Sequence, residues 1–156
     1  MIRIAINGFG RIGRNLFRLL LDHPTIEVVA INDIADTKTM AHLLKYDSIH
    51  GVLPFEVSYD EKGIIVDGKH FLFFHQKNIS NLDWKSTGID IVVESTGKHK
   101  TFEEINAHIL GGAKKVILSA PSEVEEIKTV VLGVNEHILD GTEKIVSNAS
   151  CTTNNA

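Results

Sequence analysis

The feature that most constrains the fold is a change of hydrophobic period on either side of residues 8–13, Gly-Phe-Gly-Arg-Ile-Gly. Residues 2–6 are apolar or β-branched at nearly every position, which predicts a parallel strand covered on both faces. The apolar residues that follow fall at helical spacing and predict a helix that ends before Pro24: Ile12, Leu16, Leu19 and Leu20. Residues 27–31 return to the buried-strand pattern. Strand, tight turn, helix and strand make one βαβ unit, so the two strands are expected to be parallel neighbours.

Strand and helix patterns continue to alternate along the rest of the chain. Between residues 55 and 74, however, two hairpin turn sequences, at 60–63 and 67–69, predict a small antiparallel insertion. The remaining elements are expected to be helices at 39–46 and 101–110 and strands at 89–94, 115–118, 129–132 and 144–147. No repeat, linker or low-complexity stretch interrupts the 156 residues. We therefore expect one α/β domain over residues 1–156, with a doubly wound, mostly parallel Rossmann sheet and a small antiparallel hairpin insertion.

The three glycines of residues 8–13 have the spacing of a dinucleotide-binding turn. Gly8 permits the tight turn after the strand, Gly10 leaves no Cβ where a pyrophosphate approaches the backbone, and Gly13 lets helix and strand pack closely. The backbone N–H groups of Arg11 and Ile12, at the positive end of the helix dipole, would then bind the phosphates. For the hexapeptide alone, an ordinary glycine-rich turn that binds nothing is the alternative.

An acidic residue supports the dinucleotide interpretation. Asp33 lies 20 residues after Gly13, just past the second strand, where a carboxylate bonds the ribose hydroxyls and repels a 2′-phosphate. This favours NAD over NADP, although Lys77 would soften the discrimination, and a turn cap is the alternative role for Asp33. Small residues at the carboxyl ends of two later strands would line the same crevice, although any tight connection also needs such residues: Ser95, Thr96, Gly97 and Ser119.

Cys151 is the only cysteine, so no internal disulfide can form. A helix that begins after Ser150 would place the thiol at a helix N-terminus, which favours the nucleophilic thiolate. A buried structural thiol is the usual alternative for a lone cysteine. The hydroxyl and amide groups of residues 147–154 favour the nucleophile, because they supply donors for a phosphate or an oxyanion.

Composition narrows the set of partners. The charged residues sum to a net charge of −4 without a block of either sign, so we expect no nucleic-acid partner. No apolar run approaches the roughly 20 residues that cross a bilayer, and we expect no membrane partner. Metal-ligand spacings are also lacking, so we expect no metal. A single cysteine fits a reducing compartment, and we expect a soluble, cytoplasmic protein.

Together, five segments closely resemble the amino-terminal half of phosphorylating glyceraldehyde-3-phosphate dehydrogenases, and the resemblance runs the full chain. The most specific of the five is the last, in which the cysteine lies among hydroxyl-bearing residues. The segments are residues 6–14, 32–33, 42–48, 94–97 and 147–154.

The resemblance implies a reaction and a set of site residues. Cys151 would attack the aldehyde of glyceraldehyde 3-phosphate, hydride would pass to NAD, and inorganic phosphate would cleave the thioester. Ser150 and Thr152 would help to hold phosphate, and Lys77 takes the place of an arginine that the family often has near the adenine. The family pattern carries the cofactor site over to Asn7, Arg11, Ile12, Asp33, Ser95, Thr96, Gly97 and Ser119. Complete members are homotetramers, so we expect the same of the full-length protein.

Some of the family pattern is changed or missing. Lys98 and His99 replace the more familiar hydrophobic residue after Ser-Thr-Gly, and residues 154–156 lack the usual second cysteine. The substrate domain, with its activating histidine, would follow the cysteine, so we expect this chain alone to bind NAD and to be inactive. None of the eight histidines has a family motif around it, so each is interpreted as a surface or packing residue.

Three other identities stay open at this point. An erythrose-4-phosphate dehydrogenase would share nearly every motif. An aspartate-semialdehyde dehydrogenase also joins a Rossmann domain to a cysteine nucleophile, but its glycine turn and cysteine context differ. A non-catalytic module that uses the Rossmann surface to bind a dinucleotide or a partner is the third.

Overall fold

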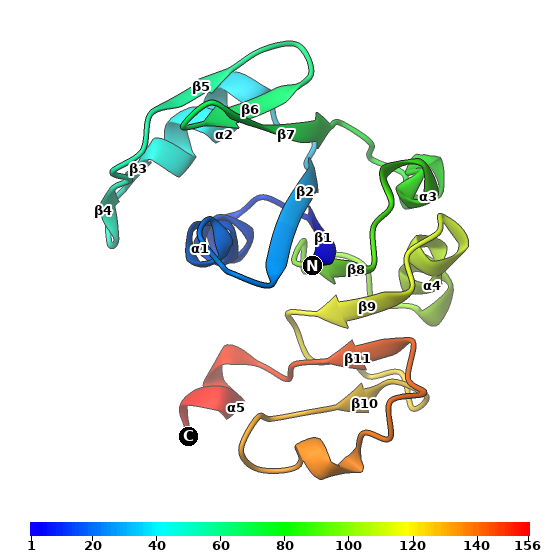
Figure 1. The fold of residues 1–156 in the computed structure, drawn as a ribbon. Helices are drawn as coiled ribbons and strands as arrows, with labels where there is room; N and C mark the ends of the chain where they lie inside the picture. Colours follow the sequence, from blue (N-terminus) through cyan, green and yellow to red (C-terminus); the bar gives the residue numbers. More distant parts are fainter.

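The structure is a computed structural model that describes all residues from Met1 to Ala156. Its centre is a nine-stranded sheet, in which the seven strands from β10 to β7 run parallel and β6 and β5 are antiparallel (Figure 1). The prediction of a doubly wound, mostly parallel sheet is confirmed. In spatial order the strands are Lys128–Thr129 (β10), Ile145–Ser147 (β11), Lys115–Leu118 (β9), Ile91–Glu94 (β8), Ile2–Asn7 (β1), Ile26–Asn32 (β2), Lys69–Phe74 (β7), Gly63–Val66 (β6) and Val57–Tyr59 (β5).

Helices cover both faces of this sheet. The α-helices are Arg11–Leu20 (α1), Thr37–Lys45 (α2), Trp84–Thr87 (α3), Phe102–Leu110 (α4) and Cys151–Asn155 (α5). Two 3₁₀ turns, Ile79–Asn81 (η1) and Glu136–Ile138 (η2), and a two-stranded arm of Tyr46–Asp47 (β3) and Gly51–Val52 (β4) complete the fold. Helices α1 and α2 lie on one side of the central strands, and α3 and α4 lie on the other (Figure 1).

Two separate hydrophobic cores follow from the alternation of side chains along the strands. In β1, Ile4 and Ile6 pack into the core with Phe17 of α1, whereas Ala5 points into the other core with Trp84 and residues of α4. Each core contains 14 buried residues. The central strands are therefore covered on both faces, as their continuous apolar sequences predict.

The hairpin insertion is confirmed as antiparallel, but it is not a separate unit. Strand β6 pairs antiparallel with both β5 and β7, and β7 also pairs in parallel with β2. The insertion therefore extends the main sheet on the α2 side (Figure 1). As a result, the end of β7 brings residues 75–77 beside the end of β2.

The helix predicted before Pro24 is confirmed as α1, although its buried residues are Gly13 and Phe17, and Ile12 and Leu19 are 52% and 78% exposed. Another detail of the sequence prediction is wrong. The strand predicted at 129–132 is only Lys128–Thr129, after which the chain turns and leaves Leu132 exposed. In both places apolar residues lie on the surface, which periodicity alone does not reveal.

Candidate cofactor site

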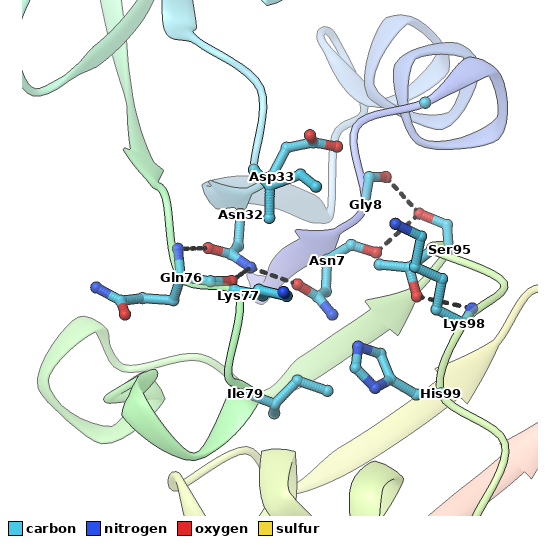
Figure 2. Close-up of a pocket in the computed structure, with 13 residues that line it drawn as sticks. Asn7, Gly8, Asn32, Asp33, Gln76, Lys77, Ile79, Ser95, Lys98 and His99 are labelled. Carbon is cyan, nitrogen blue, oxygen red and sulfur yellow. Dashed lines mark hydrogen bonds between the residues drawn. The ribbon is translucent and has the colours of Figure 1, made fainter.

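A cleft of about 280 Å³ opens at the carboxyl ends of β1, β2 and β8. From β1 the sheet continues in one direction through β2 and in the other through β8, so the cleft lies at the switch point of the strand order, where open α/β sheets bind ligands. In Figure 2, Asp33 and Gly8 lie at one end of the cleft, and Ile79 and His99 lie at the other. Seven of the predicted cofactor residues line it: Asn7, Gly8, Gly10, Asp33, Lys77, Ser95 and Thr96.

The N-terminus of α1 differs from every other α-helix in the chain, because no side chain caps it. Its N-cap is Gly10, which lines the cleft, and the first turn contains no acidic residue. The other helices are capped by the side chains of Asp36, Asp83, Thr101 and Ser150. Since the first N–H groups of a helix have no partner within it, those of Arg11 and Ile12 remain available to an anion.

Each of the three glycines in residues 8–13 is required or favoured for a different geometric reason. Gly8 has φ +93°, and a Cβ there would lie 2.6 Å from the backbone nitrogen of Thr96. At Gly13 a Cβ would lie 2.2 Å from the carbonyl oxygen of Gly8, so neither position accepts a larger residue without movement of the backbone. A Cβ on Gly10 would meet nothing within 4 Å. The open space beside Gly10 is what a ligand needs to approach the backbone closely.

Asp33 does act as a turn cap, and it also lines the cleft. Its Oδ2 accepts a 2.7 Å hydrogen bond from the N–H of Phe9, and its Oδ1 accepts one of 2.9 Å from the N–H of Ala35. A carboxylate has about four acceptor positions, so two backbone bonds leave capacity for the hydroxyls of a ligand. The two roles proposed for Asp33 are therefore compatible.

The turn after β8 is tied to the glycine turn. The hydroxyl of Ser95 donates to the carbonyl oxygen of Gly8 over 2.6 Å, and the hydroxyl of Thr96 donates to Glu94. Gly97 and Ser119 lie outside the lining of the cleft, and Gly97 borders a neighbouring hollow instead. The structure thus brings together most, but not all, of the predicted cofactor residues.

A group of buried polar side chains behind the cleft is absent from the sequence prediction. Glu94 at the end of β8 and His108 of α4 are 3% and 0% exposed, and His108 Nε2 lies 3.0 Å from Glu94 Oε2. Burial raises the pKa of the Glu94 carboxyl, but hydrogen bonds from His108, Thr96 and Asn7 outweigh burial and hold the pKa below its ordinary value. The only local signal is a charged residue that ends a buried strand. His108 is a packing residue, as expected of the histidines, but it also bonds a charge.

Cys151 is the first residue of α5, as the sequence predicts, and its side chain is exposed. The alternative of a buried structural thiol is therefore wrong. Ser150 caps this helix by accepting a 3.0 Å hydrogen bond from the N–H of Thr153. Ser150 is partly buried and Thr152 is exposed, and neither they nor Cys151 line the cleft. No side chain of the chain is hydrogen-bonded to the thiol.

Two further features bear on partners. No helix combines the length and the apolar character needed to span a bilayer. The structure also contains no group of three or more His, Cys, Asp or Glu side chains arranged to hold a metal ion.

Comparison with known proteins identifies the family. Residues 2–102 match the family described as "Glyceraldehyde 3-phosphate dehydrogenase, NAD binding domain". The chain is 53% identical over 156 residues to the glyceraldehyde-3-phosphate dehydrogenase of Thermotoga maritima, covering 99% of this chain and 46% of the relative. It is 51% identical over 154 residues to that of Geobacillus stearothermophilus, covering 98% of this chain and 46% of the relative. The chain thus spans about half the length of these curated relatives. With this match and the glycine turn, Asp33 and Cys151 in place, the chain belongs to the glyceraldehyde-3-phosphate dehydrogenase family.

Proposed function

We propose that this chain binds NAD in the cleft at the ends of β1, β2 and β8. The observation that carries the proposal is the uncapped N-terminus of α1, whose free N–H groups meet the cleft at Gly10. The pyrophosphate would bind there, and Asp33 would accept hydrogen bonds from the ribose hydroxyls. The full proposed set is Asn7, Gly8, Gly10, Arg11, Ile12, Gly13, Asp33, Lys77, Ser95, Thr96, Gly97 and Ser119, within one NAD-binding domain of residues 1–156.

Preference for NAD over NADP follows from how Asp33 is held. Because Phe9 and Ala35 both donate to the carboxylate, Asp33 does not swing away freely to make room for a 2′-phosphate. The negative charge would repel that phosphate at short range. Lys77, which follows the neighbouring strand β7 and lines the same cleft, offers a compensating positive charge, so the preference should be strong but not absolute.

For the complete protein we propose that Cys151 is the nucleophile in the oxidative phosphorylation of glyceraldehyde 3-phosphate. Its thiolate adds to the aldehyde carbon, loss of hydride converts the thiohemiacetal to a thioester, and a phosphate oxygen displaces the thiolate to give an acyl phosphate. NAD supplies the hydride acceptor. Ser150 and Thr152 flank the thiol and would hold the phosphate, and the exposure of Cys151 and Thr152 at the start of α5 supports this role.

Turnover by this chain alone should be very low, because no histidine is hydrogen-bonded to Cys151 as a general base. For the complete protein we also propose a homotetramer in the cytoplasm, with neither nucleic acid nor membrane as partner. The net charge of −4 supports the absence of a polyanionic partner. Sedimentation of the complete protein tests the oligomeric state.

The direct test is calorimetric titration of the chain with NAD and with NADP, followed by assays with glyceraldehyde 3-phosphate and phosphate. We expect NAD to bind, NADP to bind more weakly, and no appreciable turnover. A complete enzyme assayed with erythrose 4-phosphate separates the two aldehyde specificities. Failure of the folded chain to bind NAD would overturn the cofactor proposal, and together with a stable protein complex it would favour a non-catalytic partner-binding module.

A further inference from the structure

The most heavily buried charge in the chain lies behind the cleft and has no role in the reaction. The Glu94 carboxylate is 3% exposed, and an ionised group in such a place is costly unless hydrogen bonds satisfy it. Four donors do so. The amide of Asn7 donates over 2.5 Å, His108 Nε2 lies at 3.0 Å, the N–H of Thr96 donates over 2.9 Å, and the Thr96 hydroxyl donates as well.

Trp84 fixes the protonation of His108. The indole N–H of Trp84 donates to His108 Nδ1 over 3.0 Å, and because an indole can only donate, Nδ1 must be the acceptor. The ring proton is therefore on Nε2, which donates it to Glu94. In each of these hydrogen bonds, only one of the two partners can be the donor.

The same directionality continues into the wall of the cleft. Ionised Glu94 only accepts, so the NH₂ of Asn7 must face it and the Asn7 carbonyl oxygen must face away. That oxygen accepts a 2.7 Å bond from the amide of Asn32, whose own oxygen accepts the N–H of Gln76 over 2.9 Å. Asn7, Asn32 and Gln76 all line the cleft, and the dashed bonds among them are visible in Figure 2.

We propose that Glu94 and His108 are positioning residues that set the shape of the NAD cleft from behind. The inference rests on NAD binding in this cleft. Neither residue lines the cleft. Glu94 bonds two residues that do, Thr96 and Asn7, and His108 acts through Glu94. Asn7 in turn bonds Asn32 at the end of β2, and Asn32 bonds Gln76 after β7. With the carboxamides already oriented, the wall needs no rearrangement when the cofactor binds, which is the general benefit of preorganisation.

A purely structural role predicts something different. If the group only stabilised the fold, affinity for NAD would not depend on which bond is removed, provided the protein stayed folded. If it orients Asn7, affinity depends on whether Glu94 keeps its donor from position 108. Two substitutions at His108 separate these cases: leucine removes both the acceptor for Trp84 and the donor to Glu94, whereas glutamine keeps an amide nitrogen that can donate to Glu94.

The experiment compares His108→Gln with His108→Leu. A glutamine carries an amide nitrogen that reaches about as far as Nε2, so it keeps a donor for Glu94, whereas leucine of similar size keeps none. Val92→Ala is the control, because Val92 is fully buried two residues before Glu94 in the same strand but makes no bond in this group. Unfolding by urea and titration with NAD are measured on each protein.

We expect His108→Leu to weaken NAD binding by about tenfold, as misplacement of one hydrogen bond would, and His108→Gln to stay within about twofold. Val92→Ala should lower the free energy of unfolding without weakening NAD binding. Equal losses of affinity in the two His108 variants, or a loss in Val92→Ala that follows its stability, would overturn the inference.

A spectroscopic arm distinguishes failure of this inference from failure of NAD binding itself. Nitrogen-15 NMR of the free chain should show His108 protonated on Nε2 alone, and a side-chain amide signal of Asn7 that moves in His108→Leu but not in Val92→Ala. If NAD does not bind, the proposed function fails while this arm still decides whether the buried group orients Asn7. An Asn7 amide signal unchanged in His108→Leu would refute the orienting role.

Discussion

The Asp33 carboxylate accepts a 2.7 Å hydrogen bond from the backbone N–H of Phe9, so the acidic group at the end of β2 is fixed to the glycine turn that follows β1. The bond joins the two parts of the dinucleotide pattern that lie 24 residues apart. A charge held in this way cannot easily move when a larger ligand enters. Cofactor preference should therefore depend on the charge more than on the shape of this side chain.

Asp33→Asn tests that relationship. The amide oxygen can still accept from Phe9, which keeps the link to the glycine turn, but the NH₂ group cannot accept from Ala35 and the negative charge is lost. We expect NAD affinity to fall by about tenfold and NADP affinity to rise, because the repulsion of a 2′-phosphate is removed. Titration with both cofactors measures the ratio, and circular dichroism checks the fold. An unchanged ratio would show that Asp33 acts only as a turn cap.

Gly8→Ala and Gly10→Ala should separate folding from binding within one turn. At Gly8, φ is +93° and the new Cβ would lie 2.6 Å from the nitrogen of Thr96, so we expect a loss on the order of 3 kcal/mol in unfolding free energy.

At Gly10 the new methyl group meets no protein atom, so stability should change by less than about 1 kcal/mol while NAD affinity falls steeply. Urea unfolding and NAD titration on both variants provide the comparison. If Gly10→Ala binds NAD normally, the pyrophosphate does not approach this backbone.

The sequence predicts the βαβ unit and the glycine turn well, because both depend on residues close together in the chain. Gly8, Gly10 and Asp33 carry their information in spacing and type. The prediction of a short helix at Cys151 is confirmed for the same reason, since the polar cap residue is its immediate neighbour.

What the sequence does not reveal depends on contacts between distant elements. Nothing near His108 in the sequence shows that α4 places it against Glu94, with Trp84 of α3 on the other side of the ring. Similarly, the apolar character of Leu132 suggested a longer strand, yet strand β10 ends at Thr129. The length over which an edge strand stays paired is decided by tertiary packing, which local propensity does not encode.

Acid stability should report on Glu94. Burial raises the pKa of this carboxyl, but the hydrogen bonds from His108, Thr96 and Asn7 lower the pKa by more than burial raises it. In the folded protein the pKa of Glu94 therefore lies below its ordinary value of 4.5. A carboxyl with a depressed folded pKa stabilises the fold above its unfolded pKa, and this contribution is lost as the pH falls through the folded value. Unfolding free energy should therefore decrease below about pH 4.5.

Glu94→Gln provides the comparison for acid stability. The variant cannot titrate at this position, so its unfolding free energy should depend less steeply on pH below about 4.5 than that of the unsubstituted chain. Urea unfolding at a series of pH values measures both slopes. Parallel curves would mean that Glu94 does not contribute to the acid transition. Other carboxyls with lowered pKa, such as Glu143 beside Lys128, are present in both proteins and cancel in the comparison.

Cys151 should be accessible but only moderately reactive. Its side chain is exposed at the first residue of α5, so a thiol reagent can reach it in the folded protein. No imidazole contacts the sulfur, so we expect alkylation by iodoacetamide at pH 7 to be at least about tenfold slower than for the corresponding cysteine of a full-length relative, in which a histidine is expected to activate the thiol. Mass spectrometry at timed intervals gives the rates, with Cys151→Ser as the unreactive control. Equal rates in the two proteins would show that the local environment of α5 is sufficient to activate the thiol, and the proposed need for a separate base would be wrong.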